Sequence, residues 1–484
     1  MTGRTKIVAT IGPASNSAEV LGQLIDAGTD VMRLNLSHGH VDGHLEVLER
    51  IRTVATERGR HVAVLADLPG PKIRAGEFPT GGINLRAGDI VVLESGEGPS
   101  DGRRITVPYP TLLEDLTVGA RVQLGDGAIA MRVLEIGDQH ATARLETGGE
   151  ANGRPGVHLS SDNLRLPSPT EHDLVLAEAV AAAGVEFIAV SFVRSPDDIE
   201  QVREVVGGRA QLVAKMETRA SVEHLHDIVA AADVVMVARG DLGIDCPIED
   251  VPHLQKRIVR HCVEAGVPVI TATQMLESMI TAPSPTRAEV SDVANAVFDG
   301  TDALMLSGET AIGHDPAGVV RTMATVAERA ESEASYRRWA ERLGRVQRLE
   351  HHEQMSNIDP ITAALTHAAS QAAIDAEVTA ILCCTRSGRT ARAMARFRPA
   401  APMVGLSPHP QVVRSMGLSW GVTPIEVDVY GSTDEMVWFA VETALQAGLI
   451  ETGDRVLVLA GAPDPGGERP VDAATDVLRI VTVR

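Results

Sequence analysis

The chain has 484 residues, which is enough for roughly three domains, and it combines 44% hydrophobic residues with only 2% aromatic ones. This composition is typical of packed α/β layers, and the formal net charge of −21 disfavours nucleic acid and anionic membrane as partners. No apolar run approaches the roughly 20 residues that span a bilayer, and the first residues lack a signal-peptide core, so we expect a soluble, cytoplasmic protein.

Short apolar runs alternate with helix-like segments through much of the chain. Strands are predicted at 6–11, 31–36, 62–68, 187–192, 211–216, 234–238, 268–273 and 303–306. Helices are predicted at 17–27, 41–57, 171–183, 197–206, 220–231, 252–265, 287–298 and 317–333. Eight such βα units predict a closed (β/α)8 TIM barrel, built from residues 1–69 and 166–344, with functional groups at the carboxyl ends of the strands.

Two further units interrupt and follow this pattern. Residues 70–165 are rich in Gly and Val, with period-two runs and turn signals such as Gly125-Asp-Gly, which predict an inserted all-β lid, a small β-barrel. Residues 345–484 return to alternation, with helices at 361–374 and 390–397 and strands at 379–384, 403–406, 456–459 and 478–483. This C-terminal unit is predicted to be an open α/β domain.

Charged side chains follow two of the predicted barrel strands at the point where each strand ends. Lys215 and Glu217 differ by two positions, so they point the same way from one strand, and Asp241 follows the next strand. Two carboxylates beside an ammonium form a credible site for a hard divalent cation and an anionic substrate. The alternative is a set of ordinary surface salt bridges.

A second group of charges lies near the predicted lid hinge, in the segment Asp67-Leu-Pro-Gly-Pro-Lys72-Ile-Arg74. Together with Arg33 and Lys215, these cations could form a positive pocket for a phosphoryl group. The alternative is that they are solvated along a loop.

The sequence resembles pyruvate kinases over nearly its whole length. Seven blocks in the family's order carry the resemblance: TKIVATIGPAS (5–15), RLNLSHG (33–39), DLPGPKIR (67–74), AKME (214–217), ARGDLG (238–243), ITATQMLESM (270–279) and LSGETA (306–311). The resemblance implies phosphoryl transfer from phosphoenolpyruvate to ADP, giving pyruvate and ATP.

The resemblance also implies where the substrate and metal bind. The carboxylate of phosphoenolpyruvate would lie near the backbone of Gly240 and Asp241 and the hydroxyl of Thr273. Glu217 and Asp241 would hold Mg²⁺ (or Mn²⁺).

Catalysis would rest on cations aimed at the charge that develops during transfer. By the resemblance, Arg33 and Arg74 clamp the phosphate, and Lys215 stabilises the phosphoryl group and the enolate that remains. Water ordered around Thr273 and Ser307 would then protonate the enolate.

ADP would contact the lid and the loop after the second strand. The implied loop residues are Asn35, Leu36, Ser37 and His38, joined by Arg74. Much of the family has a lysine in a Lys-Gly-Val-Asn stretch of the lid, where this chain has Pro155-Gly-Val-His158. The adjacent Arg154 is expected to replace that lysine.

Members of this family commonly hold K⁺ near residues that match Asn35, Ser37, Asp67 and the backbone of Leu68. Those that depend on K⁺ usually carry Glu where this chain has Lys72. A tethered ammonium can supply the positive charge of the ion, so we expect substantial activity without K⁺. The alternative is that Lys72 faces solvent at the hinge.

One C-terminal loop matches the family's effector loop, a strand-to-helix turn that can bind a phosphorylated allosteric metabolite. Its residues are Thr385, Arg386, Ser387, Gly388, Arg389 and Thr390. A plain N-cap with a turn is the alternative. A second loop, 464–469, does not have the pattern of a fructose bisphosphate site, so the effector is open. The resemblance further implies a homotetramer.

Two other classes of function compete with a kinase. A Mg²⁺-dependent aldolase, a lyase that acts through a pyruvate enolate, would also use a barrel with Lys, Glu and Asp at strand ends, but it needs no ADP site or lid. A catalytically silent effector-binding protein is disfavoured by the retention of Lys215, Glu217, Asp241 and Thr273.

Overall fold

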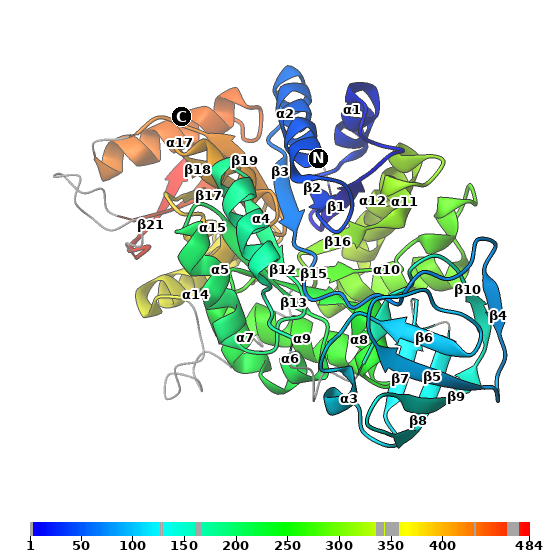
Figure 1. Cartoon of the computed structure of the whole chain (residues 1–484). Helices are drawn as coiled ribbons and strands as arrows, with labels where there is room; N and C mark the ends of the chain where they lie inside the picture. Colours follow the sequence, from blue (N-terminus) through cyan, green and yellow to red (C-terminus); the bar gives the residue numbers. More distant parts are fainter. Residues whose placement is uncertain are drawn as a thin grey trace.

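The structure is a computed structural model that describes residues 3–125, 127, 129–159, 166–334, 343, 358–429, 432–461 and 474–484. At its centre is a closed barrel of parallel strands in the order β1-β16-β15-β14-β13-β12-β3-β2 (Figure 1). These strands are β1 (Lys6–Ile11), β2 (Val31–Asn35), β3 (Ala63–Asp67), β12 (Phe187–Val190), β13 (Gln211–Met216), β14 (Val234–Ala238), β15 (Val269–Ala272) and β16 (Ala303–Leu306). The predicted TIM barrel is confirmed.

Helices surround the barrel. They are α1 (Ala18–Ala27), α2 (Val41–Glu57), α4 (Glu171–Ala182), α5 (Pro196–Val206), α6 (Arg219–Glu223), α7 (Leu225–Ala231), α9 (Val251–Ala265), α10 (Arg287–Asp299) and α12 (Pro316–Glu333). One helix predicted at 220–231 is two, because the chain breaks at His224. Short helices α8 (Arg239–Asp245), η2 (Glu277–Ile280) and α11 (Gly308–Ala311) follow β14, β15 and β16 and were not predicted.

The barrel interior is filled by alternate residues of its strands. Val8, Val31, Leu65 and Val213 belong to one buried cluster, while their neighbours along each strand pack outward against the helices. Leu418 of the C-terminal domain joins the same interior cluster. The C-terminal domain therefore helps to close the barrel.

The insertion between β3 and α4 is all-β apart from one short helix, α3 (Leu112–Asp115), as predicted. Its strands are β4 (Ile83–Leu85), β5 (Ile90–Ser95), β6 (Arg104–Val107), β7 (Arg121–Leu124), β8 (Ile129–Ile136), β9 (Ala141–Thr147), β10 (Gly149–Ala151) and β11 (Val157–His158). They form a six-stranded sheet, β11-β7-β8-β9-β5-β6, and a two-stranded one, β10-β4, around a separate core.

The C-terminal domain is an open α/β layer structure, as predicted. Its elements are α14 (Pro360–Asp375), β17 (Ala380–Cys384), α15 (Arg389–Ala395), β18 (Met403–Ser407), α16 (Pro410–Met416), β19 (Val422–Glu426), α17 (Thr433–Gln446), β20 (Arg455–Ala460) and β21 (Val477–Thr482). The sheet order is β19-β18-β17-β20-β21, with only β21 antiparallel. Both faces are covered, since Leu382 packs in a cluster with α17 and Cys383 in one with α14 and α15.

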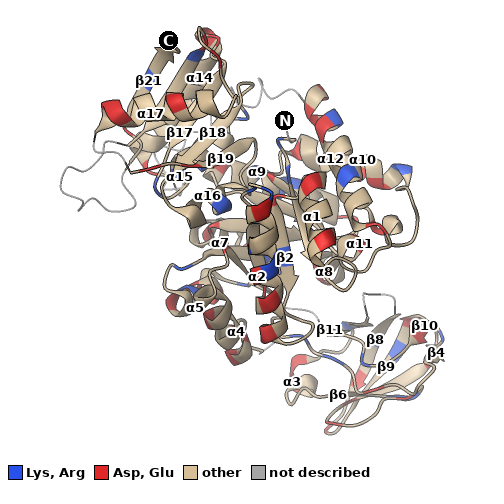
Figure 2. Cartoon of the chain, turned by 90° about the horizontal axis from the view of Figure 1, so that it is seen from above, with Lys and Arg blue, Asp and Glu red and all other residues tan. Residues whose placement is uncertain are grey.

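The lid and the C-terminal domain lie at opposite ends of the barrel (Figures 1 and 2). The C-terminal domain is anchored at the amino ends of the strands by Glu186, whose buried carboxylate accepts hydrogen bonds from Arg52 at 2.7 and 2.8 Å and from Arg414 at 2.6 Å. The same carboxylate accepts the N–H of Val64 at 2.7 Å. The carboxyl ends of the strands are thus left to the lid.

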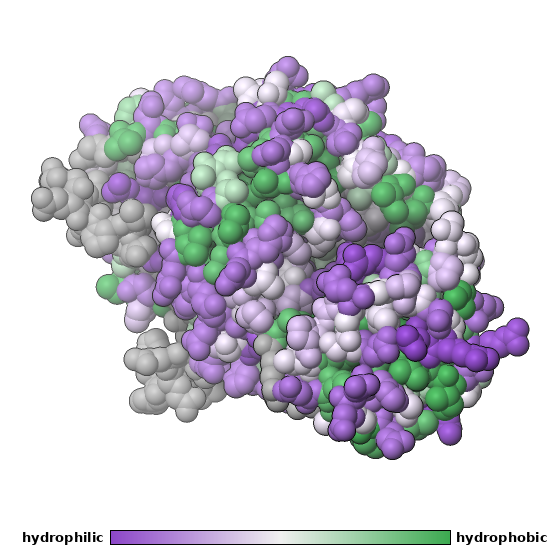
Figure 3. Space-filling model, in the orientation of Figure 1, coloured by the Kyte–Doolittle hydropathy of each residue, from purple (hydrophilic) through white to green (hydrophobic). Residues whose placement is uncertain are grey.

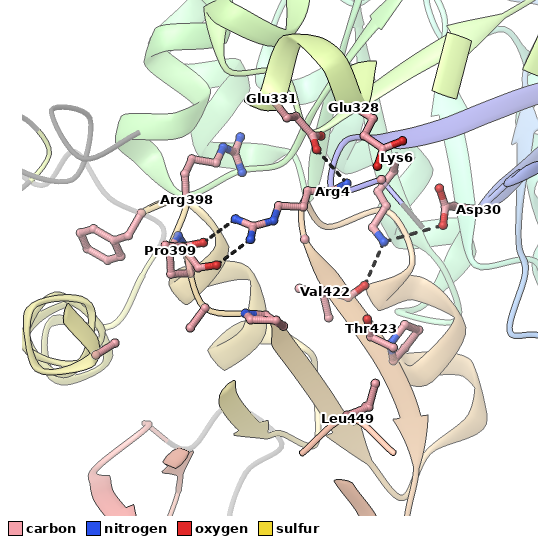
Figure 4. A pocket seen from close by; sticks show the side chains of 18 of the residues that line it. Arg4, Lys6, Asp30, Glu328, Glu331, Arg398, Pro399, Val422, Thr423 and Leu449 are labelled. Atoms are coloured by element: carbon pink, nitrogen blue, oxygen red, sulfur yellow. Dashed lines mark hydrogen bonds and ion pairs between the residues drawn. The ribbon is translucent and has the colours of Figure 1, made fainter. Parts of the chain in front are cut away.

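The N-terminal segment adds a second anchor (Figure 4). Arg4 donates to the carbonyls of Pro399 at 2.9 Å and Ala400 at 2.6 Å, and Lys6 donates to the carbonyl of Val422 at 2.9 Å. These residues line a cleft of about 1110 Å³ between the barrel and the C-terminal domain.

The outer surface is mainly polar. Figure 3 shows hydrophilic side chains over most of one face, with hydrophobic ones in separate patches. Within the described part of the chain, no helix combines the length and the apolar character needed to cross a membrane.

Candidate active site

The carboxyl ends of β2 and β3 bring Arg33 and Asp67 together. Each shares the strand face of an interior residue, Val31 and Leu65 respectively, so both side chains point into the barrel mouth. Arg33 Nε and Nη2 each lie 2.7 Å from Asp67 Oδ2, and Nη1 donates to Thr10 Oγ1 at 3.0 Å. This double contact fixes the plane of the guanidinium.

Lys215 lies at the centre of the group. Its Nζ is 3.1 Å from Asp67 Oδ1, 2.8 Å from Glu217 Oε1 and 2.7 Å from Ser191 Oγ. Burial alone would lower the pKa of Lys215, but the charges of Asp67 and Glu217 outweigh it and raise the pKa well above its ordinary value. The side chain is therefore an ammonium at any physiological pH.

Asp67 is ionised for the complementary reason. Burial would raise the pKa of this carboxyl, yet the opposite charges of Lys215 and Arg33 and the hydrogen bonds they donate lower it below its usual value. The three residues form a fixed array with two cations and one anion.

Glu217 and Asp241 supply the carboxylates expected of a metal site. Glu217 is 1% exposed; its Oε2 accepts the N–H of Phe192 at 2.7 Å, whereas Oε1 receives no well-directed hydrogen bond from the described residues. The pKa of Glu217 is raised to about 7, chiefly by burial. The positive charge of Lys215 lowers this pKa, and the negative charge of Asp241 raises it. Two carboxylates that repel each other, one of them with a buried oxygen paired only with the Lys215 ammonium among the described residues, suit a cation.

No cluster of three or more His, Cys, Asp or Glu side chains that could hold a metal occurs among the residues that the structure describes. An ion at Glu217 and Asp241 would therefore complete its coordination with substrate oxygens and water, as Mg²⁺ commonly does.

Thr273 follows β15 in a strained turn. Its φ is +70° and that of Gln274 is +54°, values that cost roughly 1–3 kcal/mol each for non-glycine residues. Thr273 Oγ1 accepts the N–H of Gly240 at 2.9 Å and donates to the carbonyl of Ala272 at 2.6 Å. Two of the predicted substrate groups, Gly240 and Thr273, are thus in direct contact.

Ser307 follows β16 and is placed by Glu309. The Ser307 N–H donates to Glu309 Oε2 at 2.7 Å, and the N–H of Leu276 donates to Oε1 at 3.1 Å. Sequence reasoning gave no role to Glu309, and it overlooked Thr10 altogether. Thr10 shares a strand face with Val8 at the end of β1, so the strand-end criterion would have found it.

The predicted nucleotide loop lies beside a group of cations. Asn35 Oδ1 accepts the N–H of Ser37 at 3.2 Å, and the N–H of Leu36 donates to the carbonyl of Asp67 at 3.0 Å. Burial lowers the pKa of His38, and the charges of Lys72, Arg74 and Arg33 lower it further. His38 is therefore neutral at pH 7, and those three cations lie close enough to act on it.

The backbone of Arg154 contacts one of these cations, but its side chain points to another partner. Arg74 pairs with Gly156 as an isolated β-bridge, and Arg74 Nη1 is 3.4 Å from the Arg154 carbonyl oxygen. The Arg154 guanidinium instead donates from Nε to the carbonyl of Ala75 at 3.5 Å. Its role toward nucleotide stays a prediction.

Lys72 lines a small cavity between the lid and the barrel. Glu217 and Asp241 line the same cavity, and Lys72 Cε lies 3.7 Å from the position a Cβ would take at Gly156. The residue is exposed overall. Leu68, the other residue of the predicted monovalent site, has its carbonyl engaged by Ser191 Oγ at 2.7 Å.

The predicted effector loop is an ordered turn at the start of α15. Gly388 has φ +79°, and its N–H donates to Thr385 Oγ1 at 3.0 Å; Thr390 Oγ1 lies 2.7 Å from Thr475 Oγ1. Arg392 lies beneath the loop, with Nη1 buried and without a hydrogen bond from the described residues. Sequence reasoning missed Arg392. The second loop, 464–469, lies outside the described residues.

Comparison with known proteins identifies two family models along this chain. Residues 2–320 match the pyruvate kinase barrel domain, and residues 363–481 match the pyruvate kinase alpha/beta domain.

Curated relatives agree with these matches. The pyruvate kinase of Methylorubrum extorquens is 40% identical over 99% of this chain and 97% of its own length. That of Geobacillus stearothermophilus is also 40% identical, over 96% of this chain and 78% of its own length. That of Clostridium acetobutylicum is 36% identical over 99% of both chains.

Proposed function

Because the chain belongs to the pyruvate kinase family, we propose that it transfers the phosphoryl group of phosphoenolpyruvate to ADP, giving pyruvate and ATP in the last step of glycolysis. The observation that carries the proposal is the array of Arg33, Asp67, Lys215 and Glu217 at the mouth of the barrel. Catalysis of phosphoryl transfer depends on fixed cations aimed at developing charge, and this array provides them.

The residues fit a resident Mg²⁺ or Mn²⁺ ion. Glu217, through its buried Oε1, and Asp241 would hold it. When bound, such an ion neutralises charge on the oxygens of the transferred group.

The carboxylate of phosphoenolpyruvate would lie against the backbone of Gly240 and Asp241 and the hydroxyl of Thr273. Arg33 and Arg74 would bind the phosphoryl oxygens, with Arg33 held in place by Asp67.

Lys215 would act on the charge of the phosphoryl group in transfer and of the enolate left behind. Its ammonium is held in place by Ser191 Oγ, which lies 2.7 Å from Nζ. Water ordered around Thr273 and Ser307 would protonate the enolate to pyruvate.

ADP would bind along the loop from Asn35 to His38 and at Arg74. The neutral His38 can accept or donate a hydrogen bond there without adding charge. Arg154 would reach the nucleotide only after its side chain leaves the carbonyl of Ala75.

A monovalent cation site would involve Asn35, Ser37, Asp67 and Leu68, with Lys72 in place of the ion. The cavity that Lys72 shares with Glu217 supports this role over a purely solvated one.

Regulation is proposed at the loop from Thr385 to Thr390, where a phosphorylated metabolite would bind, with Arg392 as an additional cation. We also propose a homotetramer, a cytoplasmic location that follows from the glycolytic role, and domains at 1–69 with 166–344, 70–165 and 345–484. The boundaries at 165 and 344 fall outside the described residues.

The test is to follow pyruvate formation from phosphoenolpyruvate with and without ADP, in the presence of Mg²⁺. The proposal expects pyruvate only with ADP, together with one ATP per pyruvate. Pyruvate formed from phosphoenolpyruvate without ADP would mean transfer to water with release of phosphate, and would contradict the proposal. Cleavage of a hydroxy-keto acid to pyruvate would instead identify the lyase that the family matches do not support.

A further inference from the structure

The turn after β15 carries the hydroxyl proposed to bind the substrate, and its backbone conformation is unfavourable. Thr273 and Gln274 both have positive φ angles. Non-glycine residues rarely adopt this region, and β-branched ones such as Thr least of all. A turn of this kind persists only where surrounding contacts outweigh its cost.

Arg239, at the end of the neighbouring strand β14, makes contacts of that kind. Its Nη2 donates to the carbonyl of Thr273 at 2.7 Å and lies 2.8 Å from Met275 Sδ, while Nε donates to the carbonyl of Ala272 at 3.3 Å. The guanidinium therefore contacts the turn at three points. These are Ala272 before it, Thr273 within it and Met275 after it. The Arg239 side chain is only 11% exposed.

The guanidinium is itself fixed by two helices. Arg239 Nη1 donates to Asp292 on α10 at 2.8 Å and to Gln255 Oε1 on α9 at 3.3 Å. The Gln255 amide in turn donates to Asp299 at 2.9 Å. Because the guanidinium is planar and rigid, it cannot rotate away from the turn without breaking several of these bonds at once.

The number of donors decides what Arg239 can do. An arginine has five N–H donors, and the five acceptors around Arg239 are the carbonyls of Ala272 and Thr273, the Met275 sulfur, the Gln255 amide and the Asp292 carboxylate. No donor is left for a substrate phosphate or carboxylate. Arg239 is therefore not a substrate ligand, although it lies one residue from Gly240.

We propose that Arg239 is a positioning residue for the reaction, which keeps Thr273 in its left-handed conformation and thereby fixes the Thr273 hydroxyl beside the N–H of Gly240. The inference rests on the proposed function, since it takes Thr273 as a ligand of phosphoenolpyruvate. Glu309 supports the same turn downstream through the N–H of Leu276, whereas Arg239 hydrogen-bonds to the carbonyl of Thr273 itself.

The test is a double-mutant cycle with Arg239→Gln and Thr273→Ala, with the KM of each substrate, kcat and thermal unfolding measured for every variant. Because Arg239 acts through Thr273, each single variant should raise the KM for phosphoenolpyruvate about tenfold and leave the KM for ADP unchanged. The double variant should be within about twofold of the more impaired single variant.

A matched control is Arg203→Gln. Arg203 also joins a carboxylate, that of Asp233 at 3.1 Å, to a carbonyl, that of Ala231 at 2.6 Å, but at the far end of the barrel. The Arg203→Gln variant should lower the unfolding temperature about as much as Arg239→Gln does, and it should leave the KM values for phosphoenolpyruvate and ADP unchanged. If Arg239→Gln does not fold, Arg239→Lys, which keeps the charge but cannot reach both carbonyls, replaces it.

A rescue variant separates positioning from general damage. Gln274 is exposed, and Gly at that position adopts a positive φ without strain. Adding Gln274→Gly to Arg239→Gln should therefore lower the KM for phosphoenolpyruvate again by about threefold or more.

Three results would overturn the inference: additive effects in the cycle, an equal rise in the KM for ADP, or the same KM change in Arg203→Gln. None of them would contradict the proposed pyruvate kinase activity. A wild-type protein that forms no pyruvate, yet binds phosphoenolpyruvate in calorimetry more tightly than Arg239→Gln does, would overturn the proposed function alone.

Discussion

Replacing Lys215 with Met tests the centre of the site. The side chain loses an ammonium that lies within 3.1 Å of three acceptors and is proposed to meet the transferred phosphoryl group. Removal of a single preorganised donor that acts on transition-state charge costs roughly 2.7–4 kcal/mol, so kcat should fall by about 10²- to 10³-fold. The KM for phosphoenolpyruvate should change much less, because the interaction develops mainly in the transition state.

The same change also leaves two buried carboxylates without their shared cation. Asp67 keeps Arg33 and Glu217 keeps the N–H of Phe192, so the loss of stability should lie at or below the roughly 3–5 kcal/mol expected for a broken buried pair. In the wild type the pKa of Asp67 is lowered, so its contribution to stability is present above about pH 3.9 and is lost as pH falls through the folded-state pKa. Loss of Lys215 raises that pKa, and acid unfolding should begin at a higher pH.

Lys6→Met is the matched control, since Lys6 is a buried barrel-strand lysine that donates to the carbonyl of Val422 at the opposite end of the molecule. The assay is coupled pyruvate formation at saturating substrate, with acid unfolding followed by circular dichroism. Turnover of Lys215→Met equal to that of the Lys6→Met control would refute the assignment of Lys215.

Three further predictions concern other parts of the molecule. Wild-type kcat in tetramethylammonium should approach that in KCl at matched ionic strength, and Lys72→Glu should create a requirement for K⁺; tenfold or greater activation of the wild type by K⁺ would show that Lys72 does not replace the ion. Arg389→Ala should abolish activation by a phosphorylated metabolite with little change in the saturated rate, and a metabolite screen without any activator of the wild type would contradict the proposed effector loop. Glu186→Ala should lower the calorimetric unfolding temperature more than Glu186→Gln, because the single amide oxygen of Gln can still accept from one of the two donors, Val64 N–H or Arg414 Nε; equal losses would argue against the anchor.

The barrel was predictable because buried parallel strands appear as short apolar runs between amphipathic helices. The break at His224 could not be predicted from the sequence. Helices α6 and α7 bury the same side of the segment, and the hydrophobic spacing continues across the break. Helix α8 was missed for another reason: its sequence contains Gly240 and Gly243, which disfavour helix, and it forms from tertiary contacts.

For the site, period-two alternation could place Arg33 and Lys215 on the interior face of their strands, since each lies two residues from an interior valine. It could not reveal what Arg239 or Arg392 contacts. Those contacts depend on distances between helices and loops that are remote in sequence, and both residues look like ordinary helix or strand-end cations until the fold is known.

Strand β14 runs from the amino end of the barrel, beside the C-terminal domain, to the end that carries the candidate active site. At its amino end, Asp233 accepts hydrogen bonds from Arg203 and from the N–H of Leu212, and its charge partly offsets the effect of burial, which lowers the pKa of Arg392 to about 10. At its carboxyl end, the same strand leads into Arg239. A phosphate bound at the proposed effector loop would bring a second negative charge near Arg392, in addition to that of Asp233.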